Sequence, residues 1–358
     1  MNKKTILTIN PGSTSTKIAV YHSNDIAFLK NIKHSSEDID KFEKIADQYE
    51  YRKNIIIQEL KDAKINIKDI QIIVARGGLV KPIPSGIYEV NERLKEDLRE
   101  GIQGQHASNL GGLIADEIAR MIPNAKAYIT DPVVVDELEE VARFTGHPEL
   151  KRISIFHALN QKAIARMHAM ATGRQYEDLN LIVVHLGGGI SIGAHKKGRV
   201  IDVNQALDGD GPFSPERTGS LPVGELVRLC FSGKYTQKEI LKMITGKGGF
   251  VAYLGTNNAY EVEQRVNNGD ELATKVQEAM AYQVAKEIGS MAVVLDCNVD
   301  AILITGGIAY NKGFIKYIRN KVQKIAPVGI YPGEDEMRAL ASNGLMVLEG
   351  EIQPLVYE

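Results

Sequence analysis

The sequence predicts an α/β protein built as two domains with related folds. Its 358 residues exceed the usual size of one hydrophobic core, which favours two domains of roughly 150 to 200 residues each. Short apolar runs alternate with amphipathic segments, as in α/β proteins with mixed or parallel sheets. The stretches 7–21 and 183–200 share one plan of strand, small-residue turn and second strand, which indicates a duplication. We expect the two turns to face each other across an interdomain cleft.

Six apolar, β-rich runs account for the predicted strands. Glycine or a polar residue ends each run, which is typical of strands buried in a sheet. In chain order the runs are "TILTIN" from Thr5, "IQIIVARGG" from Ile70, "KAYITD" from Lys126, "RISIFH" from Arg152, "LIVVHLGGG" from Leu181 and "AILITGG" from Ala301.

The segments between the strands predict helices. Residues 271–295 keep apolar side chains at helical spacing, as in a helix that covers a sheet. Thr236 and Glu239 form a capping-box pattern, and Asn311 is expected to cap a helix that runs to about Lys324. The charged segment 35–68 has helical spacing, and we interpret it as a solvated face rather than a binding patch.

Composition excludes several classes of function. A net charge of −2 with 25% charged residues gives no basic surface for nucleic acid. Cys230 and Cys297 lie far apart, so neither a disulfide framework nor a zinc site is indicated, and a reducing cytosol fits best. The chain lacks an apolar run of about 18 residues, so no membrane span is expected. Asn10, Pro11 and Gly12 interrupt the apolar stretch near the start before a signal-peptide core forms.

The stretch "HLGGGISIGAH" at 185–195 permits two interpretations. Gly187, Gly188 and Gly189 can form a plain hairpin turn, or their amides can cradle a phosphate with help from the Ser191 hydroxyl. The dinucleotide pattern fails because the turn leads into another strand, and "SGKY" and "TGKG" lack the residue that a P-loop needs after lysine.

A glycine pair follows the last predicted strand, in "AILITGGIAYNKGF" at 301–314. Gly306 and Gly307 either make a tight strand-to-helix turn or let a ribose or flat ring approach the backbone.

Three motifs in this order resemble the sugar kinase, Hsp70 and actin superfamily, and within it the acetate and butyrate kinase family. "NPGSTSTK" is similar to the family's first phosphate loop, "HLGGGISIG" to its second and "GGIAYN" to its adenosine motif. The resemblance covers nearly the whole chain. It implies that ATP is bound by Asn10, Ser13, Thr14, Ser15, Lys17, His185, Gly187, Gly188, Gly189, Ser191, Gly306, Gly307 and Asn311.

Single polar residues between the motifs also match the family. Arg76 in "VARGG" resembles the arginine that holds the substrate carboxylate, and His106 in "GQHASN" a histidine lining the same pocket. Asp131 in "ITDPV" is similar to the carboxylate associated with Mg²⁺. His157 in "IFHALNQ" and Arg217 in "SPERTGS" resemble the groups that contact the transferring phosphoryl group.

Each of these residues also has a purely structural explanation. A lone histidine is often a satisfied buried group, and an arginine after a strand is often a strand-end charge. Arg217 beside Glu216 can be half of an exposed ion pair.

In two features the sequence departs from the acetate kinases and resembles the butyrate kinase branch of the family. Related acetate kinases carry R-V-V-H-G-G where this chain has "RGG", so Gly77 or Gly78 stands in place of a bulky valine, which predicts a larger acyl pocket. They also usually carry H-L-G-N-G in the second loop, and they are longer. A third departure concerns Mg²⁺, because Ser342 aligns with a family glutamate; Glu336 and Glu349 are neighbours that can substitute.

The resemblance implies a duplicated actin-like ATPase (ribonuclease H-like) fold with a nucleotide cleft between its domains. Domain one would span 1–133 plus about 340–358, and domain two 134–339, with nucleotide and oligomer contacts. The implied reaction is reversible, Mg²⁺-dependent phosphorylation of butyrate or a branched relative by ATP. Alternatives are an acetate or propionate kinase, or an ATPase module without a small-molecule acceptor. The family's dimers imply a homo-oligomer.

Overall fold

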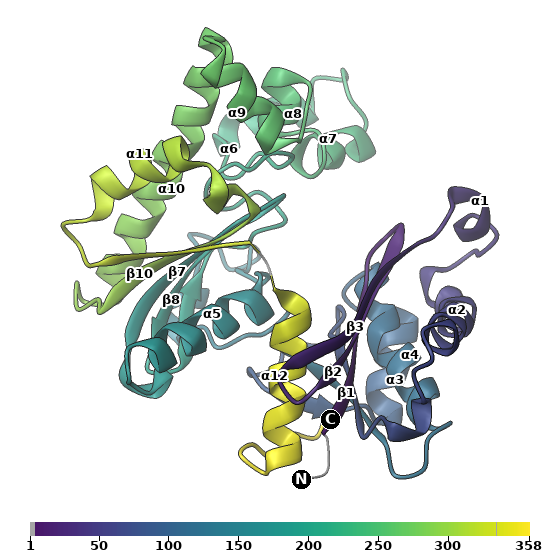
Figure 1. Ribbon diagram of the computed structural model, residues 1–358. Coiled ribbons are helices and arrows are strands. Elements are labelled where there is room, and N and C mark those ends of the chain that lie inside the picture. The colour runs from purple at the N-terminus through teal and green to yellow at the C-terminus, as the bar shows by residue number, and fades with distance from the viewer. Residues whose placement is uncertain (1–3, 334) are drawn as a thin grey trace. The chain divides into compact units, whose positions relative to one another are not determined.

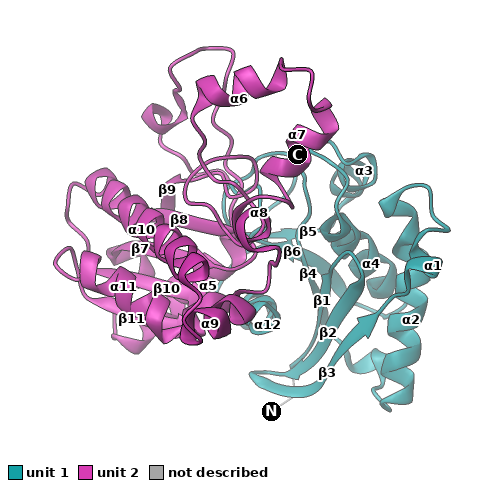
Figure 2. Ribbon diagram, turned by 90° about the horizontal axis from the view of Figure 1, so that it is seen from above, with its two compact units in different colours: residues 1–135, 335–358 teal, residues 136–334 magenta. Residues whose placement is uncertain are grey.

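The computed structural model describes residues 4–333 and 335–358. These residues form two compact units, one of residues 4–135 with 335–358 and one of residues 136–333 (Figures 1 and 2). Unit 1 is therefore discontinuous in sequence. Within the described residues, no helix combines the length and apolar character that crossing a bilayer requires.

Unit 1 is built on a six-stranded sheet in the order β3-β2-β1-β4-β6-β5. Strands β1, β4 and β6 are parallel neighbours, whereas β2, β3 and β5 pair antiparallel. The strands are β1 (Thr5–Pro11), β2 (Ser15–His22), β3 (Asp25–Lys33), β4 (Ile72–Arg76), β5 (Ile87–Glu89) and β6 (Lys126–Thr130).

Helices cover both faces of this sheet (Figure 1). α4 packs on β4 and β6 with α2 and α3 beside it, and α12 packs on β1 and β4. Their bounds are α1 (Ser36–Ile39), α2 (Tyr49–Asp62), α3 (Glu92–Glu100), α4 (Leu110–Ala119) and α12 (Glu336–Glu349). Close approach of α12 depends on Gly344, because a Cβ there would lie 2.8 Å from Cγ2 of Val74.

Unit 2 repeats the plan with a five-stranded sheet in the order β11-β10-β7-β8-β9. β7, β8 and β9 form an antiparallel meander, and β10 and β11 add in parallel beside β7. The strands are β7 (Asn180–Leu186), β8 (Ile190–Lys196), β9 (Arg199–Val203), β10 (Ala301–Gly306) and β11 (Val328–Pro332).

Alternate side chains of β7 face different helices. Ile182 and Val184 join the core under α10 and α11, and Leu181 and Val183 join the cluster under α5. The helices of unit 2 are α5 (Ala158–Ala171), α6 (Val223–Cys230), α7 (Gln237–Ile244), α8 (Gly249–Leu254), α9 (Ala259–Asn267), α10 (Glu271–Val294) and α11 (Lys312–Val322).

The two sheets share one topology, which confirms the predicted duplication. In each, a meander of three antiparallel strands is followed by parallel strands added beside the first. The capping box at Thr236 and the cap at Asn311 are confirmed as well.

Two predictions were wrong. "RISIFH" is not a strand: Ser154 and Phe156 are buried and Ile153 is 50% exposed, but the segment forms no ladder with a neighbour. Its Arg152 is anchored by side-chain bonds to Ala142 and Asp202 instead. The segment 35–68 is not wholly solvated, because α2 buries Arg52 together with Ile56 and Leu60.

Candidate active site

Three predicted residues lie at the carboxyl ends of parallel strands in unit 1. Asn10 is the last residue but one of β1, Arg76 ends β4 and Asp131 directly follows β6. Arg76 pairs with Thr130 on the neighbouring strand β6. Asp131 directly follows Thr130, so it lies one position beyond the partner of Arg76. In open α/β sheets, this edge is where ligands bind.

A carboxylate from α12 joins the group. Arg76 Nη1 lies 3.3 Å from Glu336 Oε1, and Asn10 Nδ2 donates to Glu336 Oε2. Ser342, in the middle of α12, has no part in these contacts, and Glu349 pairs with Lys4 at 2.9 Å. Of the two neighbouring glutamates named from the sequence, Glu336 is therefore the one beside Arg76.

Asp131 is held rigidly in an uncommon backbone conformation. Its φ is 37°, a region that non-glycine residues rarely occupy, and its side chain is 2% exposed. Its Oδ1 accepts from Ser85 Oγ at 2.6 Å and from the Gly86 amide at 2.9 Å. These bonds fix the direction of the carboxylate.

The described residues contain no group of three or more His, Cys, Asp or Glu side chains that could hold a metal ion. Mg²⁺ usually keeps several waters and is bound through one or two carboxylates plus substrate phosphates. A buried, fixed carboxylate such as Asp131, with Glu336 in the same unit, is compatible with that mode.

The glycines after Arg76 are required by close packing. A Cβ on Gly77 would lie 2.6 Å from Cβ of Pro132, and one on Gly78 would lie 2.6 Å from Cα of Asn109. The space where a valine side chain would lie is therefore already filled. These contacts explain why glycine stands at both positions, and the larger acyl pocket stays a prediction.

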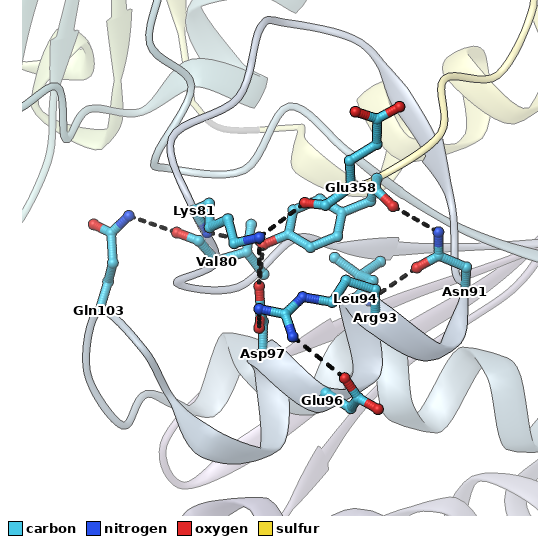
Figure 3. Close-up of polar contacts among 10 residues, drawn as sticks. Val80, Lys81, Asn91, Arg93, Leu94, Glu96, Asp97, Gln103 and Glu358 are labelled. Atoms are coloured by element: carbon cyan, nitrogen blue, oxygen red, sulfur yellow. Dashed lines mark hydrogen bonds and ion pairs between the residues drawn. The ribbon is translucent and has the colours of Figure 1, made fainter.

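The loop beyond these glycines is fixed by the end of the chain (Figure 3). The Lys81 amide donates to the Tyr357 hydroxyl at 3.0 Å, and that hydroxyl donates to Asp97 Oδ2 at 2.6 Å. Gln103 Nε2 donates to the Val80 carbonyl at 2.6 Å. Burial and Asp97 raise the pKa of Tyr357, so its hydroxyl keeps its proton.

His106 lies on the surface and caps a short turn. Its Nδ1 accepts from the Ser108 amide at 3.2 Å and lies 2.8 Å from Ser108 Oγ. Next to this turn, Asn109 Oδ1 accepts from the Leu79 amide at 2.8 Å, which ties it to the loop after Arg76.

The turn between β1 and β2 exposes small polar side chains. The Gly12 amide donates to the Ser15 carbonyl at 2.7 Å, and Ser13 and Thr14 are exposed. Lys17 pairs with Asn10 in the β1–β2 register. Sequence reasoning missed Arg52, the residue beneath this turn. It lies on the same face of α2 as the buried Ile56 and Leu60. An arginine at an apolar position of the helical pattern could have indicated a buried role.

In unit 2, two predicted histidines stack on each other. The rings of His157 and His185 have centroids 3.8 Å apart and planes 12° from parallel. His157 Nδ1 lies 2.8 Å from Ser191 Oγ, and His185 Nδ1 lies 2.8 Å from Asn160 Oδ1. The register pairs His185 with Thr305, so the stack lies beside the carboxyl end of β10.

Arg217 crosses the glycine triplet. Its Nη1 donates to the Ala206 carbonyl at 2.6 Å, and a Cβ on Gly189 would lie 1.9 Å from that nitrogen. The glycine is therefore needed for space, since neither Gly188 nor Gly189 has a positive φ. Burial lowers the pKa of Arg217, an effect that Glu216 opposes.

One nitrogen of the Arg217 side chain is unsatisfied within the described part of the chain. Its buried Nε has no hydrogen-bond partner among the described residues. Glu216 Oε2 accepts from Asn257 Nδ2 at 3.1 Å.

The glycine pair at the end of β10 has two different roles. Gly306 has a φ of 94°, and a Cβ there would lie 2.2 Å from the Leu186 carbonyl oxygen. A Cβ on Gly307 would meet nothing within 4 Å, so the backbone there is open. The Asn311 side chain caps α11 and donates to Gln277 Oε1 at 3.1 Å.

Two sheets of this topology, with small-residue turns and a glycine pair at their strand ends, define a protein of the actin-like ATPase fold. The acetokinase family model matches residues 149–349. The chain belongs to the acetokinase family.

Curated relatives match over the whole length. The chain is 58% identical to butyrate kinase 2 and 56% identical to butyrate kinase 1, both from Clostridium acetobutylicum, over 99% of each chain. Among solved structures, acetate kinase of Porphyromonas gingivalis aligns with a TM-score of 0.79 at 19% identity, over 96% of this chain and 100% of that one. Acetate kinase of Entamoeba histolytica gives 0.78 at 14%, over 97% and 100%. These structural matches confirm the predicted fold.

Proposed function

We propose that this chain transfers the γ-phosphoryl group of ATP to butyrate, reversibly, to give ADP and butyryl phosphate. The observation that carries the proposal is the 58% identity to a butyrate kinase over 99% of both chains. At that identity, the chemistry of the site is expected to be common to both.

The chemistry needs charge neutralisation more than it needs a base. A carboxylic acid with a pKa near 5 is already ionised at neutral pH, so its oxygen can attack the γ-phosphorus directly. The bond from that phosphorus to the β,γ-bridging oxygen breaks, and ADP leaves. Because both reactants are anions, catalysis rests on cations and in-line positioning.

Unit 1 offers groups for the acid. Arg76 is a cation at the sheet edge, and its pairing with Glu336 at 3.3 Å is looser than a short charged hydrogen bond. In the proposal, its guanidinium holds the butyrate carboxylate, and His106 and the loop after Gly78 line the acyl chain.

Unit 2 offers groups for the phosphoryl group. Support for Arg217 comes from its buried Nε, which lacks a partner among the described residues and would be satisfied by a phosphoryl oxygen. His157 is oriented by Ser191 and by its stack on His185. When bound, Mg²⁺ would neutralise charge on the β- and γ-phosphates, and Asp131 with Glu336 would hold it.

The test is an acyl phosphate assay. Purified protein is incubated with MgATP and a straight or branched acid of two to six carbons. Hydroxylamine converts any acyl phosphate that forms into a hydroxamate, and the hydroxamate is measured. We expect the highest kcat/KM with butyrate or isobutyrate and a graded fall with neighbours, since one methylene contributes about 1 to 3 kcal/mol.

A matched pair of variants excludes a contaminating kinase. Arg217→Met removes the proposed phosphoryl contact, and Arg228→Met removes an exposed arginine of α6. The first is expected to lose activity and the second to keep it. No hydroxamate from any acid would overturn the kinase, and a maximum at acetate would overturn the choice of butyrate.

A further inference from the structure

Arg52 is a fully buried cation beneath the first turn of unit 1. Its side chain is 1% exposed, although it comes from a helix rich in charged residues. Nη1 donates to the Gly12 carbonyl at 2.7 Å and to the Ser15 carbonyl at 3.2 Å, and Nη2 donates to the Ser13 carbonyl at 3.0 Å. Nε and Nη2 also donate to Gln48 Oε1.

These bonds set the direction of the whole turn. The remaining carbonyl, that of Thr14, accepts from the His34 amide at 2.9 Å. Because a trans peptide is planar, its N–H points opposite to its C=O. Drawing the Gly12 and Ser13 carbonyls towards Arg52 therefore turns the Ser13 and Thr14 amides the other way, where they meet no acceptor among the described residues.

Within residues 4–333 and 335–358, no carboxylate pairs with Arg52 to balance its charge. All its hydrogen-bond acceptors are neutral oxygens of backbone, Gln48 and Thr16. Burial lowers the pKa of Arg52 to about 10, so it stays protonated at neutral pH. A buried cation without a counter-charge is costly, and an anion on the far side of the turn would offset that cost.

We infer that Arg52 is a positioning residue for the nucleotide: it holds the turn 12–15 with its amides directed at the phosphate chain and places a buried positive charge behind them. This inference rests on the proposed function, because it takes the phosphates of ATP and ADP as the ligand. The contact is indirect, through the turn, so Arg52 need not touch the nucleotide.

The experiment compares three variants. Arg52→Met keeps a long side chain without charge or donors, and Arg52→Lys keeps the charge without the planar fork. Ile56→Ala is the matched control, because Ile56 is 0% exposed on the same helix and its side chain has no hydrogen-bonding group. Steady-state KM is measured for MgATP and for butyrate. The midpoint of thermal unfolding is measured with and without MgADP.

We expect Arg52→Met to raise KM for MgATP by about 10-fold or more, as for the loss of hydrogen bonds to a charged group, with KM for butyrate within about twofold of wild type. Arg52→Lys should be intermediate. MgADP should raise the thermal midpoint less in both than in wild type. Ile56→Ala should lower the midpoint and leave both KM values unchanged.

Equal rises in the two KM values, or an unchanged KM for MgATP, would overturn the inference. If Arg52→Met does not fold, Arg52→Lys decides the question by the same comparison of KM for MgATP with KM for butyrate. If the wild type phosphorylates no acid, the proposed function fails, and calorimetric binding of MgADP to wild type and Arg52→Lys still tests Arg52. Equal affinities would then overturn its role.

Discussion

Arg76 lies at the end of β4 with only Glu336 as its ion-pair partner among the described residues. We predict that Arg76→Ala chiefly raises KM for butyrate, by about 10- to 100-fold, because a charged hydrogen bond contributes about 1.5 to 3 kcal/mol. Initial rates over a range of butyrate concentrations check this. An unaltered KM would remove Arg76 from the acid site.

Gly189 leaves the space that Arg217 occupies. Gly189→Ala places a methyl group where Nη1 of Arg217 now lies, so we predict a fall in kcat of about 100-fold, as for the loss of one transition-state donor. Gly289→Ala in α10 is the matched control, because its Cβ would meet nothing within 4 Å and it lies outside the motifs. Wild-type kcat in Gly189→Ala would contradict the role of Arg217.

Among the site residues, the sequence predicted those that lie in motifs and missed Arg52, which reaches the site from another element. Asn10, Arg76 and Gly306 follow apolar runs, so their place at the strand ends could be inferred from local pattern. Glu336 was named from the resemblance only as one of two glutamates that can substitute for Ser342, and Arg52 was missed. Their partners lie far away in sequence, and folding alone brings them together.

The end of the chain stabilises the loop after β4 through the hydrogen bonds of Tyr357 to Lys81 and Asp97. We predict that Tyr357→Phe lowers the free energy of unfolding by about 1 to 3 kcal/mol, because buried Asp97 loses a donor and the Lys81 amide loses an acceptor. KM for butyrate should rise, whereas KM for MgATP should not.

Urea unfolding and steady-state kinetics measure these changes. Tyr260→Phe is the control, since that residue of α9 is 68% exposed and lies outside the motifs. An unfolding free energy equal to that of wild type would show that the hydroxyl contributes nothing to this loop.

Central strands were easier to predict than edge strands. β1, β4, β7 and β10 are buried on both faces and therefore read as continuous apolar runs. β3 has one buried residue in nine, so it gave no such signal. The segment 152–157 alternates buried and more exposed side chains as a strand does, but it pairs with no neighbouring strand. Strand pairing is set by tertiary structure, so the local pattern could not reveal this.

Two buried histidines make the stability of the molecule depend on pH. Burial, reinforced by Arg52, lowers the pKa of His34 from 6.5 to about 4, and burial lowers the pKa of His195 well below its usual value. Between pH 6.5 and 4 the unfolded chain takes up a proton at His34 that the folded chain does not. The contribution of neutral His34 to the free energy of unfolding is therefore fully present above pH 6.5, and it is lost as the pH falls towards 4.

We predict that wild type loses about 2 kcal/mol more unfolding free energy than His34→Gln between pH 7 and pH 5. Urea titrations at the two pH values measure the difference. His147→Gln, at an exposed position, should keep the wild-type dependence. Equal losses in wild type and His34→Gln would mean that His34 takes up its proton equally in both states.

The discontinuity of unit 1 has a consequence for biosynthesis. β1 and β4 leave the ribosome early, but α12, which packs on both of them, is translated only after all of unit 2. At about 5 to 20 residues per second, this delay is on the order of 10 to 40 s. During that interval the nascent sheet has one apolar face without its helix, whereas unit 2 is continuous and can fold as it emerges.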